Sequence, residues 1–323
     1  MLTLNDIEQA ASLIRTVVPP TPQYAWPKLA ARAGCRVWVK HENHTPTGAF
    51  KVRGGLIYMS ELAQSGAAPH GVISATRGNH GQSISLAASR AGIPATIYVP
   101  HGNSPDQNAS MRAFGATVVE FGDDFDQARI EAGRIAAERE LHFVPSFHMT
   151  LVKGVATYAL ELFKAADELD AVYVPIGMGS GICGLITVRD LLGLKTKIIG
   201  VVAEKAAAMA LSFAARKPVP TPTAKTFADG MATRDPQPQA VEIILRGAER
   251  IVQVSEDEIA EAMRIYFDDT HHVVEGAGAA SLAALLKERD RWRGSNVGVI
   301  ASGGNIERAR FERVLNGVTP LVG

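Results

Sequence analysis

The chain has 323 residues, of which 46% are hydrophobic and 20% are charged, and its formal net charge is zero. A neutral chain lacks the basic field that attracts nucleic acid or an anionic membrane, and no stretch approaches the ~20 apolar residues that cross a bilayer. We therefore expect a globular enzyme with a small-molecule substrate and no nucleic-acid or membrane partner, long enough for two domains.

Along the first half of the chain, a short amphipathic helix over 5–14 ends before prolines 19, 20 and 22. A strand over 36–40 then leads into a loop and a helix over 54–62. From residue 71 strands and helices alternate, with strands over 72–75, 95–99 and 116–120 and helices over 82–90, 105–114 and 125–139. Strands separated by helices predict a parallel sheet with right-handed crossovers.

A second alternating series begins with a helix over 155–164. Strands are expected over 171–176, 197–203 and 297–301, and helices over 182–192, 205–215, 255–266 and 276–287. Ser255 and Glu258 form the capping box of one of these helices. The stretch 216–238 is rich in Pro, Thr and Lys and is expected to be a long irregular connection.

These elements predict an α/β fold with two open, twisted, mostly parallel sheets that carry helices on both faces. We expect residues 1–66 and 150–323 to form a large cofactor-binding domain and residues 67–149 a small one. A cofactor cleft is expected between the domains, at the carboxyl ends of strands. The two cysteines cannot form a disulfide framework, and no signal peptide precedes residue 16, so a cytoplasmic protein is expected.

The stretch H-E-N-H-T-P-T-G-A-F-K-V-R, residues 41–53, places Lys51 in an apolar run behind a turn-forming loop. Rigid backbone and poor hydration there disfavour the ammonium form, which lowers the lysine pKa and makes the amine nucleophilic. This is what a lysine needs to form a Schiff base. The alternative is an ordinary surface lysine at the start of a helix.

A glycine-rich run between a strand and a helix consists of Gly177, Met178, Gly179, Ser180 and Gly181. Glycines let backbone N–H groups approach a phosphate, and the helix N-terminus adds a favourable dipole. The run also fits G-x-G-x-x-G, and Glu204 follows about twenty residues later, as an NAD-dependent oxidoreductase requires. Such a site needs neither the lysine stretch nor the S-G-G-N motif at 302–305. A tight turn without a ligand is a third reading.

Four motifs in register carry a family resemblance: residues 42–54 around Lys51, R-G-N-H-G-Q at 77–82, G-M-G-S-G at 177–181 and S-G-G-N at 302–305. Over nearly the whole chain this pattern resembles the pyridoxal-phosphate enzymes of the tryptophan-synthase-β type, or fold type II. The similar branch is that of serine and threonine dehydratases. Its lysine motif reads roughly E-N-x-x-x-T-G-S-F-K-x-R-G, and here Ala49 replaces the serine.

The resemblance implies that pyridoxal 5'-phosphate is the cofactor and that Lys51 forms the Schiff base, with Phe50 close by. It assigns the run 177–181 to the phosphate, Asn79 to the pyridoxal 3′-oxygen and Glu275 to the ring edge. Ser302 is the expected partner of the pyridine nitrogen. A neutral hydroxyl cannot hold that nitrogen protonated, which favours β-elimination over transamination. Helix capping is the alternative role for Asn79, Glu275 and Ser302.

The substrate carboxylate is assigned by the resemblance to Thr76, Asn79 and His80. Arg77 departs from the family, because many relatives have Ser or Ala there and racemases use the serine to protonate the second face of Cα. A guanidinium with a pKa above ~12 cannot play that part. We therefore disfavour a racemase and expect Arg77 to bind the α-carboxylate or a second substrate carboxylate. The alternative is a solvent-exposed loop arginine.

The expected activity is that of a carbon-oxygen lyase, an ammonia-lyase that converts threonine or serine to a 2-oxo acid and ammonia. Lys51 would take the Cα proton. Arg77 and the interrupted glycine loop motivate 3-hydroxyaspartate or 3-phenylserine as alternative substrates. A non-catalytic binding module is a further alternative.

The resemblance also implies a homodimer. No regulatory domain is expected after the last motif. Some relatives bind a structural cation near the motif Ala228-Asp229-Gly230. Lys225 stands here where an acidic ligand would help, so no metal is predicted.

Overall fold

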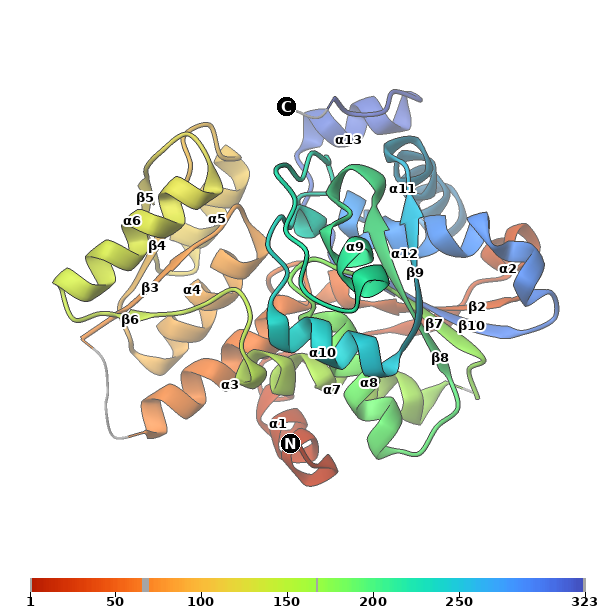
Figure 1. Ribbon diagram of the computed structural model, residues 1–323, viewed down its shortest axis with the longest axis horizontal. Helices are drawn as coiled ribbons and strands as arrows, with labels where there is room; N and C mark the ends of the chain where they lie inside the picture. Colours follow the sequence, from red (N-terminus) through yellow and green to blue (C-terminus); the bar gives the residue numbers. More distant parts are fainter. Residues whose placement is uncertain (1, 66–69, 167, 322–323) are drawn as a thin grey trace.

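The computed structural model describes residues 2–65, 70–166 and 168–321 (Figure 1). Two sheets form the framework, each flanked by helices on both faces. The predicted α/β class with two mostly parallel sheets is confirmed. The predicted domain boundary at residues 66 and 67 lies outside the described residues, and the division into domains stays a prediction.

The large sheet has six strands in the order β1-β2-β10-β7-β8-β9. Their bounds are β1 Gln23–Ala25, β2 Arg36–His41, β7 Ala171–Pro175, β8 Lys197–Ala203, β9 Ala248–Val254 and β10 Asn296–Ala301. All neighbours pair in parallel except β1, which is antiparallel to β2. Because β2 and β10 pair from Arg36↔Asn296 to His41↔Ala301, the loops that follow them leave the sheet at the same point.

The small sheet has four parallel strands in the order β5-β4-β3-β6. They are β3 Val72–Ala75, β4 Ala95–Val99, β5 Thr117–Glu120 and β6 His142–Phe143. Side chains alternate between two cores, as strand geometry requires. Val72 packs into the core shared with α3 and α4, whereas its neighbour Ile73 packs against α6.

Thirteen α-helices connect and cover the strands in the described chain. They are α1 Leu4–Ile14, α2 Pro27–Ala33, α3 Lys51–Gln64, α4 Asn79–Ala91, α5 Pro105–Ala113, α6 Phe125–Glu138, α7 Met149–Ala165, α8 Ser180–Leu191, α9 Ala208–Ala215, α10 Pro238–Gly247, α11 Glu256–Thr270, α12 Gly276–Lys287 and α13 Arg308–Leu315. Single 3₁₀ turns span Glu42–His44 (η1), Glu204–Ala206 (η2), Asp229–Met231 (η3) and Arg289–Trp292 (η4). Among these helices none combines the length and apolar character that a membrane crossing requires.

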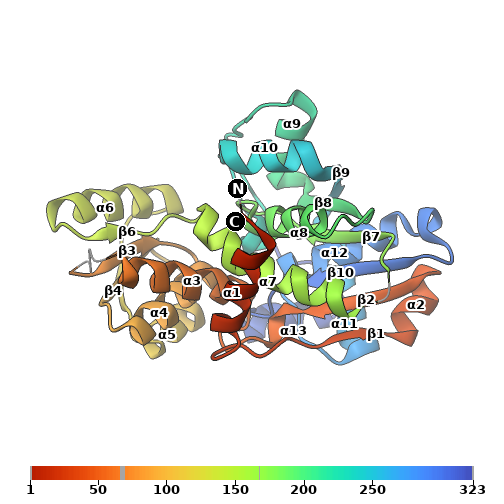
Figure 2. The same cartoon turned by 90° about the horizontal axis from the view of Figure 1, so that it is seen from below.

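Helices α1, α3 and α7 lie between the two sheets (Figure 2). Helix α3 packs against α4 on one side and α7 on the other, so Lys51 at its first residue sits where the two halves of the molecule meet. Around the large sheet, α7 and α8 cover one face and α11 and α12 the other (Figure 1).

Several sequence predictions need correction in their bounds. Helix α3 begins at Lys51 rather than at residue 54, α4 at Asn79 rather than at residue 82, and α7 at Met149 rather than at residue 155. Helices α2, α10 and α13 and strands β1, β6 and β9 were not predicted. Strand β9 is the edge of the large sheet, and polar residues interrupt its apolar pattern, so its burial alternates irregularly.

Candidate active site

The loop before α3 and the loop after β10 are joined by backbone contacts. Phe50 N donates to Ser302 O at 3.0 Å, and Ala49 forms an isolated antiparallel bridge with Gly303. These contacts hold Lys51 beside Ser302, although the two residues are far apart in the chain. The register of β2 and β10 is the cause, because it ends both strands at the same edge of the sheet.

One pocket collects every residue predicted to bind the cofactor. Its lining is Phe50, Lys51, Asn79, Pro175, Gly177, Met178, Gly179, Ser180, Gly181, Gly230, Glu275, Ala277 and Ser302. The three additional members, Pro175, Gly230 and Ala277, carry no polar side chain, and none of them was predicted to bind the cofactor. Residues Thr76, Arg77 and His80, predicted to bind substrate, are not part of this lining.

Lys51 contributes an amine to the lining of the pocket. Burial lowers the pKa of its amine to about 8, and the nearby Glu275 carboxylate partly opposes this shift. Its Nζ lies 5.3 Å from the centroid of the Phe50 ring. A lysine with this pKa has a substantial neutral fraction near neutral pH, which is the nucleophilic form. The lowered pKa expected from the sequence is thus present.

The glycine run forms a close-fitting turn at the N-terminus of α8. Gly179 has φ of 101°, in the left-handed region that favours glycine, and α8 begins at Ser180. A Cβ on Gly177 would lie 2.2 Å from Gly230 O, so no side chain fits there. Backbone N–H groups at a helix N-terminus suit a phosphate or another small anion. Glu204 is the acidic residue that an NAD-binding site would require. It is exposed, and its Oε1 lies 3.7 Å from Lys287 Nζ.

Gly177→Ala is expected to weaken cofactor binding and to lower the free energy of unfolding by roughly 1–3 kcal/mol, since a methyl group collides with backbone. Absorption titration with the cofactor and urea unfolding measure the two effects. Gly133→Ala is the matched control, because a Cβ there meets no described atom within 4 Å. Equal cofactor affinity in the two variants would contradict the assignment of this turn.

Two hydrogen bonds hold the side-chain carboxamide of Asn79. Its Nδ2 donates to Glu275 Oε1 at 2.8 Å, and its Oδ1 accepts from Asn305 Nδ2 at 2.8 Å. Asn305 Nδ2 also donates to Thr47 O at 2.7 Å, so it connects Asn79 to the loop before Lys51. Asn305 is the last residue of the S-G-G-N motif, and no role was predicted for it from the sequence. Its position in this motif is the sequence feature that could have indicated a role at the site.

Glu275 is buried, and this desolvation raises its pKa to about 7 from the ordinary 4.5. In the cofactor-free protein we expect stability to fall as pH rises from 4.5 to about 7. Over that range the unfolded chain has lost the proton and the folded chain retains it. The expected loss is roughly 2–3 kcal/mol.

Urea unfolding at several pH values measures this slope. Glu275→Gln should flatten it, because an amide has no proton to lose, while Glu61→Gln on the exposed part of α3 should leave it unchanged. Identical slopes for wild type and the Glu275 variant would show that this carboxyl does not set the pH dependence.

The predicted substrate residues lie beside the pocket. Thr76 is buried, and its Oγ1 accepts from Gly78 N at 3.0 Å. His80 is buried too, and its Nε2 has no hydrogen-bond partner among the described residues. Arg77 is half-exposed, with Nη1 3.9 Å from Asp229 Oδ1, and Asp229 Oδ2 accepts from Arg310 Nη1 at 3.1 Å. Since Gly230 lines the pocket, these charges stand next to it.

A buried ion network supports the lysine loop and was missed by sequence reasoning. Arg53, two residues after Lys51, donates to Glu42 at 2.7 and 2.9 Å and to Glu161 at 2.8 and 2.9 Å. Lys40 Nζ donates to Glu161 Oε2 at 2.7 Å. All four side chains are almost completely buried. The network ties β2, α3 and α7 together and fixes the start of α3.

The amine, the glycine turn and the Ser302 hydroxyl together suit an aldehyde that carries an anionic group. A family model described as "Pyridoxal-phosphate dependent enzyme" matches residues 14–303. An L-threonine ammonia-lyase of Thermotoga maritima is 32% identical, covering 98% of this chain and 79% of its own. An L-threo-3-hydroxyaspartate ammonia-lyase of a Pseudomonas species is 33% identical over 97% and 98%. The structure of a pyridoxal 5'-phosphate-dependent aspartate racemase superposes with a TM-score of 0.90 at 28% identity, covering 96% and 98%.

Proposed function

Because the chain belongs to the pyridoxal-phosphate-dependent enzyme family, we propose that it is an ammonia-lyase that converts threonine or serine to a 2-oxo acid and ammonia. The observation that carries this proposal is the pocket in which the Lys51 amine, the glycine turn and Ser302 meet. The similarity to an L-threonine ammonia-lyase over 98% of the chain supports the substrate class.

The pocket fits pyridoxal phosphate. Gly177, Gly179 and Gly181 line it without side chains, at the N-terminus of α8, and Lys51 provides an amine with a lowered pKa. We propose that residues 177–181 hold the phosphate, Asn79 the 3′-oxygen and Ser302 the ring nitrogen. Glu275 and Phe50 would lie at the ring. When bound, the cofactor withdraws electrons from the substrate Cα and so acidifies its proton.

The protein's own groups would then direct the reaction. The Lys51 amine would accept the proton of the substrate Cα as a general base. Thr76, Asn79 and His80 orient the substrate carboxylate. The Ser302 hydroxyl is neutral and leaves the ring nitrogen unprotonated, which favours loss of the β-hydroxyl over transamination.

The group of Arg77, Asp229 and Arg310 favours 3-hydroxyaspartate as a second candidate substrate. Two guanidinium groups share one carboxylate, so these three side chains together carry a net positive charge. A relative with 33% identity is named for L-threo-3-hydroxyaspartate. A second substrate carboxylate could replace Asp229 as the partner of Arg77. No comparable observation favours 3-phenylserine.

Arg77→Ala is expected to lower kcat/KM for 3-hydroxyaspartate by roughly 10- to 100-fold more than for threonine, because a charged hydrogen bond is lost only with the acidic substrate. Steady-state assays of the 2-oxo acid with both substrates measure the difference. Arg310→Ala is the comparison variant, since it removes the other partner of Asp229. Equal losses on both substrates would assign Arg77 to the α-carboxylate instead.

The proposed activity is tested with purified protein and a substrate panel. Borohydride should attach the cofactor irreversibly to the peptide that contains Lys51, as mass spectrometry would show. Threonine, serine, 3-hydroxyaspartate and 3-phenylserine are then assayed as separate stereoisomers for 2-oxo acid release, and aspartate and serine for racemisation by chiral chromatography. A protein that takes up no pyridoxal phosphate, or one that racemises without releasing a 2-oxo acid, would refute the proposal.

We also propose a homodimer in the cytoplasm, with residues 1–66 and 150–323 in the larger domain and 67–149 in the smaller. The family resemblance of the motifs supports the dimer, and the separate small sheet supports the division. Analytical ultracentrifugation of the holoenzyme tests the oligomeric state, and limited proteolysis tests the boundaries.

A further inference from the structure

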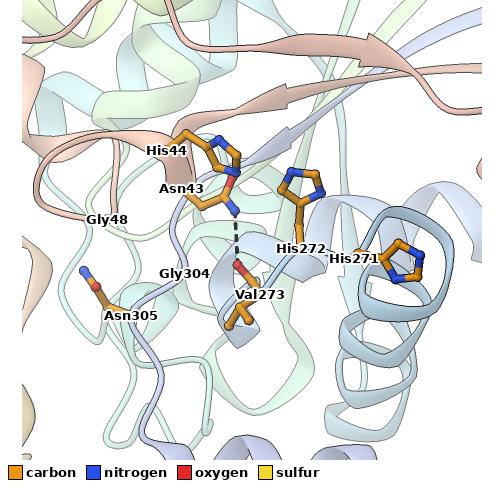
Figure 3. Close-up of a pocket in the computed structure, with 8 residues that line it drawn as sticks. All are labelled: Asn43, His44, Gly48, His271, His272, Val273, Gly304 and Asn305. Atoms are coloured by element: carbon orange, nitrogen blue, oxygen red, sulfur yellow. Dashed lines mark hydrogen bonds between the residues drawn. The ribbon is translucent and has the colours of Figure 1, made fainter.

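Three histidines from two distant segments meet beside the loop that leads to Lys51. His41 ends β2 and His44 ends η1, whereas His272 follows α11. The ring centroids of His41 and His272 are 4.4 Å apart, and those of His44 and His272 are 4.8 Å apart. Asn43 Nδ2 donates to Val273 O at 3.1 Å and joins the two segments (Figure 3).

We propose that His41, His44 and His272 form a binding site for a divalent transition-metal ion such as Zn²⁺. One ring nitrogen from each histidine lies within 4.8 Å of the others. Imidazole nitrogens are preferred ligands of Zn²⁺, Ni²⁺ and Cu²⁺, and three of them leave a fourth tetrahedral position for water. His44 is exposed in an open pocket, so the water can enter from that side.

The ligands require only a modest closure. Nitrogens bound to one Zn²⁺ at ~2.0–2.1 Å lie about 3.3 Å apart in a tetrahedral site. The nitrogens here are farther apart by roughly 1.5 Å at most, since all lie within 4.8 Å. His44 is on the surface, where a rotation of its side chain supplies this movement.

Unpartnered ring nitrogens are the second observation that points to a ligand. Nδ1 of His41 and Nδ1 of His272 are buried, and neither has a hydrogen-bond partner within the described part of the chain. The His41 side chain is completely buried. Burying a polar atom without a partner destabilises the folded state, so native proteins rarely keep one without a reason.

Trp26 competes with the metal for His41. Its Nε1 donates to His41 Nε2 at 3.1 Å, and an indole N–H can only donate. A metal-bound imidazole carries its proton on the other nitrogen. The ion therefore either takes the Nε2 lone pair itself or, when bound to Nδ1, leaves a proton on Nε2. In both cases Trp26 must release this hydrogen bond, so removing its N–H should tighten metal binding.

The site would connect two parts of the cofactor pocket. His41 and His44 precede the loop that ends at Lys51, and His272 lies three residues before Glu275. An ion bound across them stabilises the folded form by mass action, so the thermal midpoint should rise with metal concentration. Sequence spacing did not reveal this group, because adjacent His271 and His272 have no ligand spacing of their own.

The test uses the holoenzyme after chelation and dialysis. Co²⁺ titration followed by its d–d absorption reports imidazole coordination, and displacement by Zn²⁺ gives the Zn²⁺ affinity. We expect His44→Ala and His272→Ala to raise the dissociation constant by at least ~10-fold. Trp26→Phe should lower it. His271→Ala is the matched control, because His271 lines the same pocket outside the cluster (Figure 3).

The variants also separate binding from folding. Exposed His44 can be replaced without touching the core, and metal-free thermal midpoints show whether each variant is folded. In wild type and His271→Ala the midpoint should rise on addition of Zn²⁺, whereas in His44→Ala and His272→Ala it should not. Co²⁺ binding that is equally tight in the His44, His272 and His271 variants would overturn the proposal, whether or not the enzyme is active.

Discussion

Replacing Lys51 by alanine is expected to lower turnover of any substrate by about 10³–10⁴-fold or more, because nucleophile and general base are lost together. Borohydride should then fix no cofactor to the chain. The pocket around the residue contains one amine, and the glycine turn and Ser302 remain in place. Turnover assays, the absorbance of the bound cofactor and mass spectrometry of the reduced protein measure these effects.

Lys51→Arg tests whether activity is lost because the imine cannot form or because the positive charge is missing. A guanidinium keeps the positive charge beside Glu275 but cannot form an imine, so this variant should be as inactive as the alanine variant. Lys153→Ala is the control, since Lys153 forms a surface ion pair with Glu61 at 3.0 Å. Normal turnover by Lys51→Ala, or borohydride labelling of another lysine, would show that the nucleophile lies elsewhere.

Arg53→Met is expected to lower the free energy of unfolding by about 3–5 kcal/mol, because it leaves buried carboxylates of Glu42 and Glu161 without their main cation. Lys40 remains, but of these two carboxylates its described ion pair is with Glu161, at 2.7 Å. Since Arg53 anchors the first turn of α3, the cofactor should also bind more weakly. Urea unfolding and cofactor titration measure the two effects.

Arg134→Met tests whether the burial of Arg53 is the reason that Arg53→Met lowers the free energy of unfolding. Arg134 also contacts two glutamates, Glu131 and Glu138, at 2.6 to 2.8 Å, but 57% of its side chain is exposed. Solvent screens such pairs, so the expected loss of stability is much smaller than that of Arg53→Met. A loss as large as that of Arg53→Met would mean that the number of ion pairs, rather than their burial, governs the effect.

Several features of this protein could be read from short stretches of sequence. The alternation of strands and helices predicted the parallel sheets, since burial leaves a local periodic pattern. The apolar setting of Lys51 predicted its lowered pKa, and the positions of Gly177 and Gly179 predicted a tight turn before α8. The family resemblance of the motif around Ser302 implied that this residue would lie at the same pocket as Lys51, and both line it.

Contacts between distant segments were decided only by the tertiary structure. The pairing of β2 with β10 brings Ser302 to Lys51, and the packing of α3 on α7 brings Glu161 to Arg53. The meeting of His272 with His41 and His44 has the same origin. The residues next to a side chain in the sequence indicate whether it is buried, because buried segments are rich in apolar residues. They do not indicate which distant residue packs against that side chain, since this depends on how whole strands and helices pack.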